Sequence, residues 1–254
     1  MESVRKPFQG VRNIVRFNWH FFALSAGIMS VLALVWRLLP GPLADLAGMS
    51  LLLAAAATLL PLIVSVIVYD RSRLYTLDWL DDWQIPPGAN LVNIHSGFDE
   101  TSVALHCKFP SAHLTVLDFY DPARHTEISI RRARRAHPPW PGTLTVSTSA
   151  LSLPDHGSDA VFLILAAHEI RDDAQRAHFF REVKRLLAPG GRIFVTEHLR
   201  DLPNLLAYNM GAFHFHTRRT WERTFAAAGL KIVHASNHTP FLNHFILQSD
   251  GTPP

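Results

Sequence analysis

Residues 153–198 read LPDHGSDAVFLILAAHEIRDDAQRAHFFREVKRLLAPGGRIFVTEH and set out a strand, a helix and a second strand. The apolar run at 160–165 is too short for a helix and suits a strand that is covered on both faces. Apolar residues recur every three or four positions across 171–187, as in a helix that covers a sheet. The turn at 189–191 ends this helix before a strand at 192–196. This order predicts parallel strands joined by a helix, with ligands beyond the carboxyl ends of the strands.

Four motifs of this stretch are shared with one enzyme family. They are Leu153-Pro154, Ser158-Asp159, Ala167-His168-Glu169 and Leu187-Ala188-Pro189-Gly190-Gly191. Through them the chain resembles the small-molecule branch of the class I methyltransferases that use S-adenosylmethionine (SAM), over about residues 88–249. The resemblance implies an α/β fold with a Rossmann-like seven-stranded sheet and a closing antiparallel hairpin. It also implies SAM as the cofactor.

Two long apolar segments, residues 17–39 and 46–69, precede this part of the chain. Each reaches the roughly 20 residues that cross a bilayer. The first carries only His20 and Arg37 near its ends, and the second carries no charge. Because soluble helices normally keep a polar face, a transmembrane helical hairpin is favoured over a buried helical pair. A cleaved signal peptide has one short apolar region and fits less well.

Basic residues flank the hairpin on one side. The link at 40–45 has no Lys or Arg, whereas both outer flanks do, at Arg5, Lys6, Arg12, Arg16, Arg71 and Arg73. The positive-inside bias therefore predicts two spans in the inner (cytoplasmic) membrane, with the catalytic domain in the cytoplasm.

The chain divides into three predicted parts. Residues 1–72 form the membrane anchor, 73–88 a juxtamembrane connector and 89–254 a methyltransferase-like domain. The connector is either an amphipathic helix at the membrane surface or a helix that covers the edge of the sheet.

The formal net charge of +3 is mild and does not indicate a nucleic-acid partner. The one basic cluster, Arg131–Arg135, falls on a predicted helix that starts at Asp121-Pro122. This cluster has three interpretations, from most to least favoured: a solvated helix face, contact with anionic lipid headgroups, and contact with nucleic acid. The single cysteine, Cys107, excludes an intrachain disulfide.

The first predicted strand, residues 91–94, runs into the turn that should hold the cofactor. The resembled family has a glycine-rich turn there, of which this chain keeps the middle glycine, Gly97. Asn93 stands at the position of the family's acid and His95 at that of its first glycine. Because a side chain at a glycine position can block a ligand, this departure weakens the cofactor site. The resemblance still assigns Asn93, His95 and Gly97 to cofactor binding.

Asp118 ends the second predicted strand, at residues 114–117. A carboxylate there can accept hydrogen bonds from both ribose hydroxyls, and the alternative is a surface aspartate at a strand end. Phe119 is a candidate to cover the adenine ring. By the resemblance, Ser149 and Ala150 occupy positions that contact the adenine.

The predicted strands at 160–165 and 192–196 deliver His168, Glu197 and His198 to the expected active edge, and these are the candidate catalytic residues. His168 is either a base for the methyl acceptor or a structural hydrogen-bonding group. The resemblance makes Tyr208, His214 and His216 candidate substrate residues.

No metal site is predicted, because the sequence has no HExxH motif and no paired cysteines. If a metal were bound, its cluster would come from the polar residues at the strand ends and the loop after them: His168, Glu169, Glu197, His198, His214 and His216.

The predicted function is methyl transfer from SAM to an O, N or S atom of a lipophilic or membrane-partitioned small molecule, such as a fatty acyl carboxylate, a quinone precursor or a lipid. The alternative is a catalytically inactive methyltransferase-like subunit at the membrane, which the altered glycine turn favours. A nicotinamide oxidoreductase is less favoured, because the last two predicted strands, 230–236 and 244–247, form a closing hairpin. The expected partners are the acceptor and the membrane, without nucleic acid, and the sequence does not indicate an oligomeric state.

Overall fold

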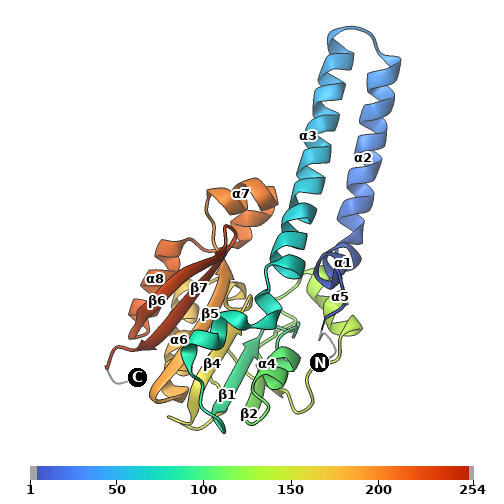
Figure 1. The fold of residues 1–254 in the computed structure, drawn as a ribbon. Coiled ribbons are helices and arrows are strands. Elements are labelled where there is room, and N and C mark those ends of the chain that lie inside the picture. The colour runs from blue at the N-terminus through green and yellow to red at the C-terminus, as the bar shows by residue number, and fades with distance from the viewer. Residues whose placement is uncertain (1–4, 252–254) are drawn as a thin grey trace.

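A computed structural model describes residues 5–251, in which a long helical hairpin rises from an α/β domain (Figure 1). Residues 1–4 of the predicted anchor and 252–254 of the predicted methyltransferase-like domain lie outside the described residues.

The domain is built on one seven-stranded sheet with the order β3-β2-β1-β4-β5-β7-β6. The first five strands in this order are parallel, and β7 runs antiparallel to both β5 and β6. This arrangement confirms the predicted Rossmann-like sheet with a closing antiparallel hairpin. The strands are β1 (Asn90–His95), β2 (His113–Asp118), β3 (Leu144–Thr145), β4 (Ser158–Ile164), β5 (Leu187–His198), β6 (Leu230–Thr239) and β7 (Leu242–Ser249).

Helices cover both faces of the sheet. Along β5, Ile193 and Val195 face a core shared with α6 and α8, whereas Phe194 faces a second core formed with α4 and the connector. This alternation is the period of two expected of a strand. The helices of the domain are α4 (Ser102–Lys108), α5 (Ile128–Ala136), α6 (Asp173–Leu186), α7 (Leu202–Tyr208) and α8 (Arg218–Ala227).

The segments before α4 and α5 are fixed by aspartates, and α5 starts later than the sequence suggests. The carboxylate of Asp99 accepts hydrogen bonds from the N–H groups of Thr101 and Ser102, and α4 begins at Ser102. Asp121 caps a separate turn through the N–H of Ala123, and α5 begins only at Ile128. The non-helical residues before α4 and α5 therefore line the carboxyl edge of the sheet.

The connector packs on the sheet, as the second of its two interpretations states. It forms two short 3-10 turns, η2 (Leu74–Thr76) and η3 (Asp78–Trp83), instead of one helix. Leu74, Leu77 and Leu80 are buried in the core on the Phe194 face. Trp79 stacks on His244 with ring centroids 4.1 Å apart. The apolar side chains of this segment therefore cover the sheet.

The hairpin consists of α2 (Trp19–Leu38) and α3 (Pro42–Ser65), and α3 continues into a π-helical turn, η1 (Val66–Arg71). Two helical stretches, Trp19–Leu38 and Pro42–Thr76, are long and apolar enough to cross a membrane, with mean hydropathies of 1.9 and 2.7. Every residue of α2 is at least partly exposed. The two helices pack on each other, and the hydroxyls of Ser25 and Thr58 are hydrogen-bonded at 2.6 Å.

A short first helix, α1 (Gln9–Phe17), joins the hairpin to the domain. The carboxylate of Asp70, at the root of α3, accepts hydrogen bonds from the N–H groups of Gly10 (2.8 Å) and Val11 (3.0 Å). These are orphan donors in the first turn of α1, which a carboxylate stabilises. Gly10 is needed for this approach, because a Cβ there would lie 2.4 Å from Tyr69 Cβ. The contact fixes α1 over the carboxyl edge of the sheet.

Candidate functional site

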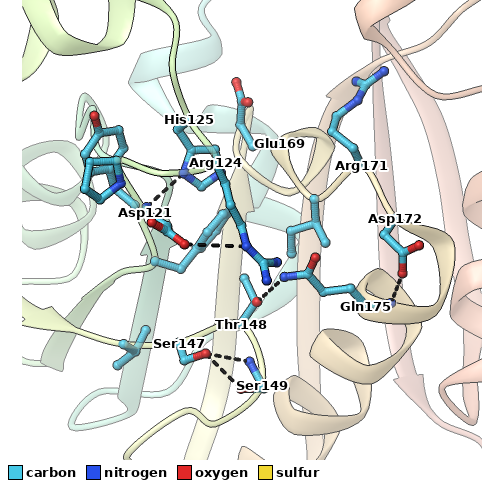
Figure 2. A pocket seen from close by; sticks show the side chains of 15 residues that line it. Asp121, Arg124, His125, Ser147, Thr148, Ser149, Glu169, Arg171, Asp172 and Gln175 are labelled. Atoms are coloured by element: carbon cyan, nitrogen blue, oxygen red, sulfur yellow. Dashed lines mark hydrogen bonds and ion pairs between the residues drawn. The ribbon is translucent and has the colours of Figure 1, made fainter.

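Two cavities lie at the carboxyl edge of the sheet, and Glu169 lines both. The first has a volume of about 970 Å³ and lies beyond β2 and β3. Figure 2 shows it between Asp121 and His125 on one side and Gln175 of α6 on the other, with Ser147 and Ser149 along its base. The second has a volume of about 260 Å³ and lies beneath α1. The parallel fold places both where ligands of such sheets bind.

Asp118, at the end of β2, is buried and already has partners for both carboxylate oxygens. One oxygen accepts a hydrogen bond from the N–H of Tyr120 (2.9 Å), and the other lies 2.5 Å from Nη1 of Arg134. Gly97 adopts a φ of +104°, and a Cβ there would lie 2.9 Å from Tyr120 and 3.0 Å from Arg134. Tyr120 and Arg134 therefore pack directly over the glycine turn.

Arg134 comes from the basic cluster on α5, so the solvated helix face is wrong for part of that cluster. Its guanidinium also donates to the carbonyl of Gly97 at 3.2 Å. Arg132 of the same cluster donates to the carbonyl of Phe17 (2.6 Å), at the end of α1. The cluster thus joins the hairpin root to the cofactor turn, while Arg131 and Arg135 are exposed.

The histidine at the first glycine position, His95, is buried. Its Nδ1 accepts a hydrogen bond from the N–H of Gly97 (3.1 Å), which leaves the proton on Nε2 in the neutral ring. Burial lowers the pKa of His95, and the charge of Asp118 only partly opposes this. Nε2 is buried and has no hydrogen-bond partner among residues 5–251, although the ring lines the second cavity. An N–H donor is therefore available to a ligand.

These observations fit SAM. The first cavity has the size of sites for small molecules. Asp118 would hold the ribose hydroxyls, and His95 would donate to a polar group of the ligand. Arg134 has to leave Asp118 for this, and its side chain, 35% exposed, can move into solvent.

The structure supports the predicted adenine-contacting residues only in part. Phe119 borders the first cavity, but it is buried in the core against Phe179, with ring centroids 5.5 Å apart. Tyr120 is the more accessible aromatic residue at the cavity, and it stacks on His125. Ser149 lines the cavity, whereas Ala150 lies in the exposed turn that follows. Asn93 bonds to Thr101 and Ser102 and holds the turn rather than facing the cavity.

His168, in the short 3-10 turn η4 (Ala167–Glu169), is held by Glu197 at the end of β5. Its Nδ1 lies 2.6 Å from one oxygen of Glu197, and its backbone N–H donates to the other oxygen at 3.1 Å. Glu197 is fully buried. Burial alone would lower the pKa of His168, but the charge of Glu197 and hydrogen bonds to Glu197 and Glu169 raise this pKa to about 10. At neutral pH the ring is an imidazolium, which donates protons, so this structure does not favour the predicted base role.

Glu169 lies between two imidazoles. One of its oxygens is 3.5 Å from Nε2 of His168 and 3.4 Å from Nε2 of His214. Burial alone would raise the pKa of Glu169, but the hydrogen bonds from His168 and His214 hold it well below its usual range. The predicted substrate residue His214 thus joins the same cluster, at the end of the 3-10 segment η5 (Asn209–His214).

His198 is buried and has partners at both ring nitrogens. Its Nδ1 donates to the carbonyl of Phe241 (2.9 Å), and its Nε2 accepts from the hydroxyl of Tyr69 (2.9 Å). Burial and the charge of His168 lower the pKa of His198 to about 4, so the ring is neutral. His198 therefore joins the end of β5 to the root of the hairpin.

The two remaining predicted substrate residues lie away from the cavities. Nε2 of His216 accepts from Arg176 (3.0 Å), and its ring packs edge-on against Trp221, between α6 and α8. Tyr208 ends α7 and packs edge-on against His198 and Phe215. The family resemblance does not fix which polar side chains of this segment turn inward, so these two assignments are not supported.

Several residues of the site belong to no sequence motif and are not predicted from the sequence. Glu100 accepts from Arg5 (2.8 Å), Asn13 (3.1 Å) and Tyr75 (2.9 Å) and thereby joins three segments around the second cavity. Tyr69 lines the same cavity. Both lie at the interface of the hairpin and the domain, which the sequence divides into separate parts.

Comparisons with known proteins agree with this geometry. Residues 96–195 match the family model of a methyltransferase domain. No curated protein matches the chain significantly. Among solved structures, a SAM-dependent methyltransferase from Methanosarcina mazei is 16% identical with a TM-score of 0.51, over 67% of this chain and 96% of that one.

Two further structures show the same fold. A SAM-dependent methyltransferase from Aquifex aeolicus is 14% identical with a TM-score of 0.50, over 70% of this chain and 93% of that one. The N,N-8-amino-8-demethyl-D-riboflavin dimethyltransferase from Streptomyces davawensis is 15% identical with a TM-score of 0.51, over 85% of this chain and 62% of that one. With the sheet order, these structures show that the domain has the class I methyltransferase fold, and the family model adds a methyltransferase-domain match over residues 96–195.

Proposed function

We propose that this methyltransferase is anchored in the membrane by α2 and α3 and methylates an O, N or S atom of a lipophilic small molecule. The observation that carries this proposal is the position of the second cavity. Its wall includes Asn13, Ile14 and Phe17 of α1 and Tyr69 at the root of α3. The cavity therefore opens where the hairpin meets the domain.

The exposure of the hairpin supports the anchor. Leu24, Val31 and Leu34 of α2 and Leu52 and Leu53 of α3 are each more than half exposed. A soluble protein rarely exposes a continuous apolar surface of this extent. A buried core helix is the other use of such a sequence, and the exposure of α2 argues against it.

The segment α7–η5 has an apolar face beside the hairpin. Leu202, Leu206, Met210 and Phe213 are exposed and recur every three or four residues. The segment lies beside α3, where the side chain of Asn209 donates to the carbonyl of Ala57 (Figure 1). Ala57 is eight residues before the end of α3, or about 12 Å along the helix axis. The apolar face of α7–η5 would thus enter the membrane interface.

The second cavity suits an amphipathic acceptor. Phe17, Phe98 and Phe215 supply apolar surface, whereas His168 and Glu169 supply polar groups at the carboxyl edge. Its volume of about 260 Å³ is below the range for whole drug-sized ligands. Only the reacting end of a lipid-like molecule would enter, with its apolar part along α1 and the membrane.

The residues of this chain would act mainly by binding and orientation, which can supply much of the rate of a transfer between two bound groups. SAM, when bound, supplies the electrophilic methyl group. Glu169 and the His168 imidazolium offer the acceptor one hydrogen-bond acceptor and one donor. A carboxylate acceptor needs no base, which agrees with the protonated state of His168.

The test uses the full chain in nanodiscs made from bacterial phospholipids, with SAM that carries a radiolabelled methyl group and a total lipid extract as the acceptor source. Label should enter the organic phase with the wild type and not with Asp118→Ala. Label that enters only water-soluble compounds would contradict the lipophilic acceptor. Absence of S-adenosylhomocysteine (SAH) binding to the folded chain would instead support the inactive subunit.

A further inference from the structure

A cluster of metal-ligating groups lies beside the second cavity, and its residue Glu169 also lines the first. His168 and Glu169 come from η4, after β4, and His214 comes from the end of η5. The three side chains can each offer one donor atom, and these atoms lie within 4.8 Å of one another. Two segments of the chain therefore bring two imidazoles and one carboxylate to one point.

Two of the three distances within this cluster suit a metal ion. Zinc binds imidazole nitrogen and carboxylate oxygen at about 2.0–2.2 Å with tetrahedral geometry, which separates neighbouring ligand atoms by about 3.3–3.5 Å. The carboxylate of Glu169 lies 3.5 Å from Nε2 of His168 and 3.4 Å from Nε2 of His214. Glu169 is thus spaced from both rings as a shared ligand set requires.

Each ring has a further carboxylate near its opposite nitrogen, and the one beside His168 lies within hydrogen-bond distance. Nδ1 of His168 lies 2.6 Å from the buried Glu197, and Nδ1 of His214 lies 3.7 Å from Glu127. Metal-binding histidines typically donate their other ring N–H to a carboxylate, a carbonyl or water, which fixes the ring. Arg171 also donates to the carbonyl of His214 and holds this end of η5 in place.

We propose that His168, Glu169 and His214 bind a divalent transition-metal ion, which would displace the proton that His168 carries at Nε2 in the metal-free chain, with Glu197 as the positioning residue. Two imidazoles and one carboxylate suit Zn²⁺ or Fe²⁺. His168 and Glu169 line the second cavity, so such an ion borders the space that the acceptor would enter. A three-ligand site keeps a coordination position for water or for an oxygen atom of the acceptor. The link to the acceptor rests on the proposed function, but the metal site itself does not.

The test measures metal binding directly. The full chain is purified in detergent with a histidine-free affinity tag, treated with chelator, and titrated with Zn²⁺ by calorimetry and with Co²⁺ by visible absorption. We expect one ion per chain, a dissociation constant of about one micromolar or tighter, and a tetrahedral Co²⁺ spectrum that Zn²⁺ displaces.

His214→Ala and Glu169→Gln should each weaken Zn²⁺ binding at least about 100-fold, more than the 10- to 100-fold typical of a lost outer-shell group. His113→Ala, which removes an exposed histidine at the start of β2, is the matched control and should bind as the wild type does. Circular dichroism checks that each variant is folded. Two ligand variants are used so that the test still stands if one of them does not fold. Absent binding, or binding equal in all four proteins, would overturn the metal site.

SAH is titrated into the same samples to separate this proposal from the proposed function. Zn²⁺ binding without SAH binding would leave the metal site standing and contradict the methyltransferase. SAH binding without Zn²⁺ binding would overturn the metal site alone, and the cluster would then be an ion-pair network.

Discussion

The guanidinium of Arg134 lies 2.5 Å from the carboxylate of Asp118, at the place where the ribose of the cofactor should bind. Arg134 comes from α5, and its ring contact with Tyr120 and hydrogen bond to Gly97 keep it over the cofactor turn. A cation at this place opposes binding in two ways. It occupies the ribose acceptor, and it adds a positive charge near the sulfonium of SAM.

Arg134→Ala should therefore tighten cofactor binding. We expect the dissociation constant of SAH to fall about tenfold, which corresponds to 1.4 kcal/mol, and that of SAM to fall further because SAH lacks the sulfonium charge. Calorimetric titration of both ligands checks this. Arg135→Ala, on the exposed side of the same helix, is the control and should change neither constant. Weaker binding by Arg134→Ala would show instead that Arg134 is part of the cofactor site.

Asp118→Ala should abolish cofactor binding and leave the fold intact. Asp118 is the buried carboxylate at the end of β2, and Arg134, once unpaired, can turn toward solvent. The measurement is SAH titration together with far-UV circular dichroism. Asp121→Ala, which removes an exposed carboxylate of the first cavity, should keep most of the affinity. Unchanged affinity in Asp118→Ala would remove this residue from the cofactor site.

The cofactor edge shows what the sequence can and cannot predict. Asp118 could be found because a strand ends there at the right distance from the turn. Arg134 could not, because the pattern of Arg131–Arg135 indicates a helix but not which side of it meets the sheet. That choice depends on how α1 and the hairpin root press α5 onto the domain, which is a tertiary contact.

The catalytic edge shows the same limit. The sequence places His168 and Glu197 at the ends of neighbouring parallel strands, and the register of Ile164 with Thr196 brings them together. The partners of His214 and His216 depend on the path of the segment after β5, which the sequence pattern does not fix. One of these histidines therefore reaches the cluster, and the other packs behind α6.

The single cysteine tests the orientation of the hairpin. Cys107 is exposed on α4, so it reports the side of the membrane that holds the domain. If the domain is cytoplasmic, a membrane-impermeant maleimide should label Cys107 in inverted vesicles and not in spheroplasts. Leu43→Cys in a Cys107→Ser chain lies at the other end of the hairpin and should give the opposite result. Labelling of Cys107 in spheroplasts would contradict the predicted orientation.

The free energy of unfolding should decrease at acidic pH because of His198. Its pKa is about 4 in the folded chain, lowered by burial and by the charge of His168, against about 6.5 when unfolded. The contribution of His198 to the free energy of unfolding is therefore fully present above pH 6.5 and is lost as the pH falls toward 4. The expected loss from this group is about 2 kcal/mol between pH 7.5 and 5.

Other histidines act on the same pH range. Burial lowers the pKa values of His216 and His244 to about 3, which adds to the loss, whereas the raised pKa of His168 opposes it. The readout is the slope of unfolding temperature against pH in detergent. His198→Gln should flatten this slope, and His113→Gln, an exposed control, should leave it unchanged. An equal slope in His198→Gln would show that His198 has the same pKa in the folded and unfolded chains.

The buried pair of His168 and Glu197 should show strong coupling. His168→Ala leaves the fully buried carboxylate of Glu197 without its imidazolium, and breaking such a pair typically costs about 3–5 kcal/mol. Glu197→Gln added to His168→Ala removes the unpaired charge, so the double variant should be more stable than His168→Ala alone. Denaturant unfolding of the four chains of this cycle, at neutral pH and without added metal, measures the coupling. Additive effects would show that the two groups act independently and that Glu197 does not carry the charge that holds His168 protonated.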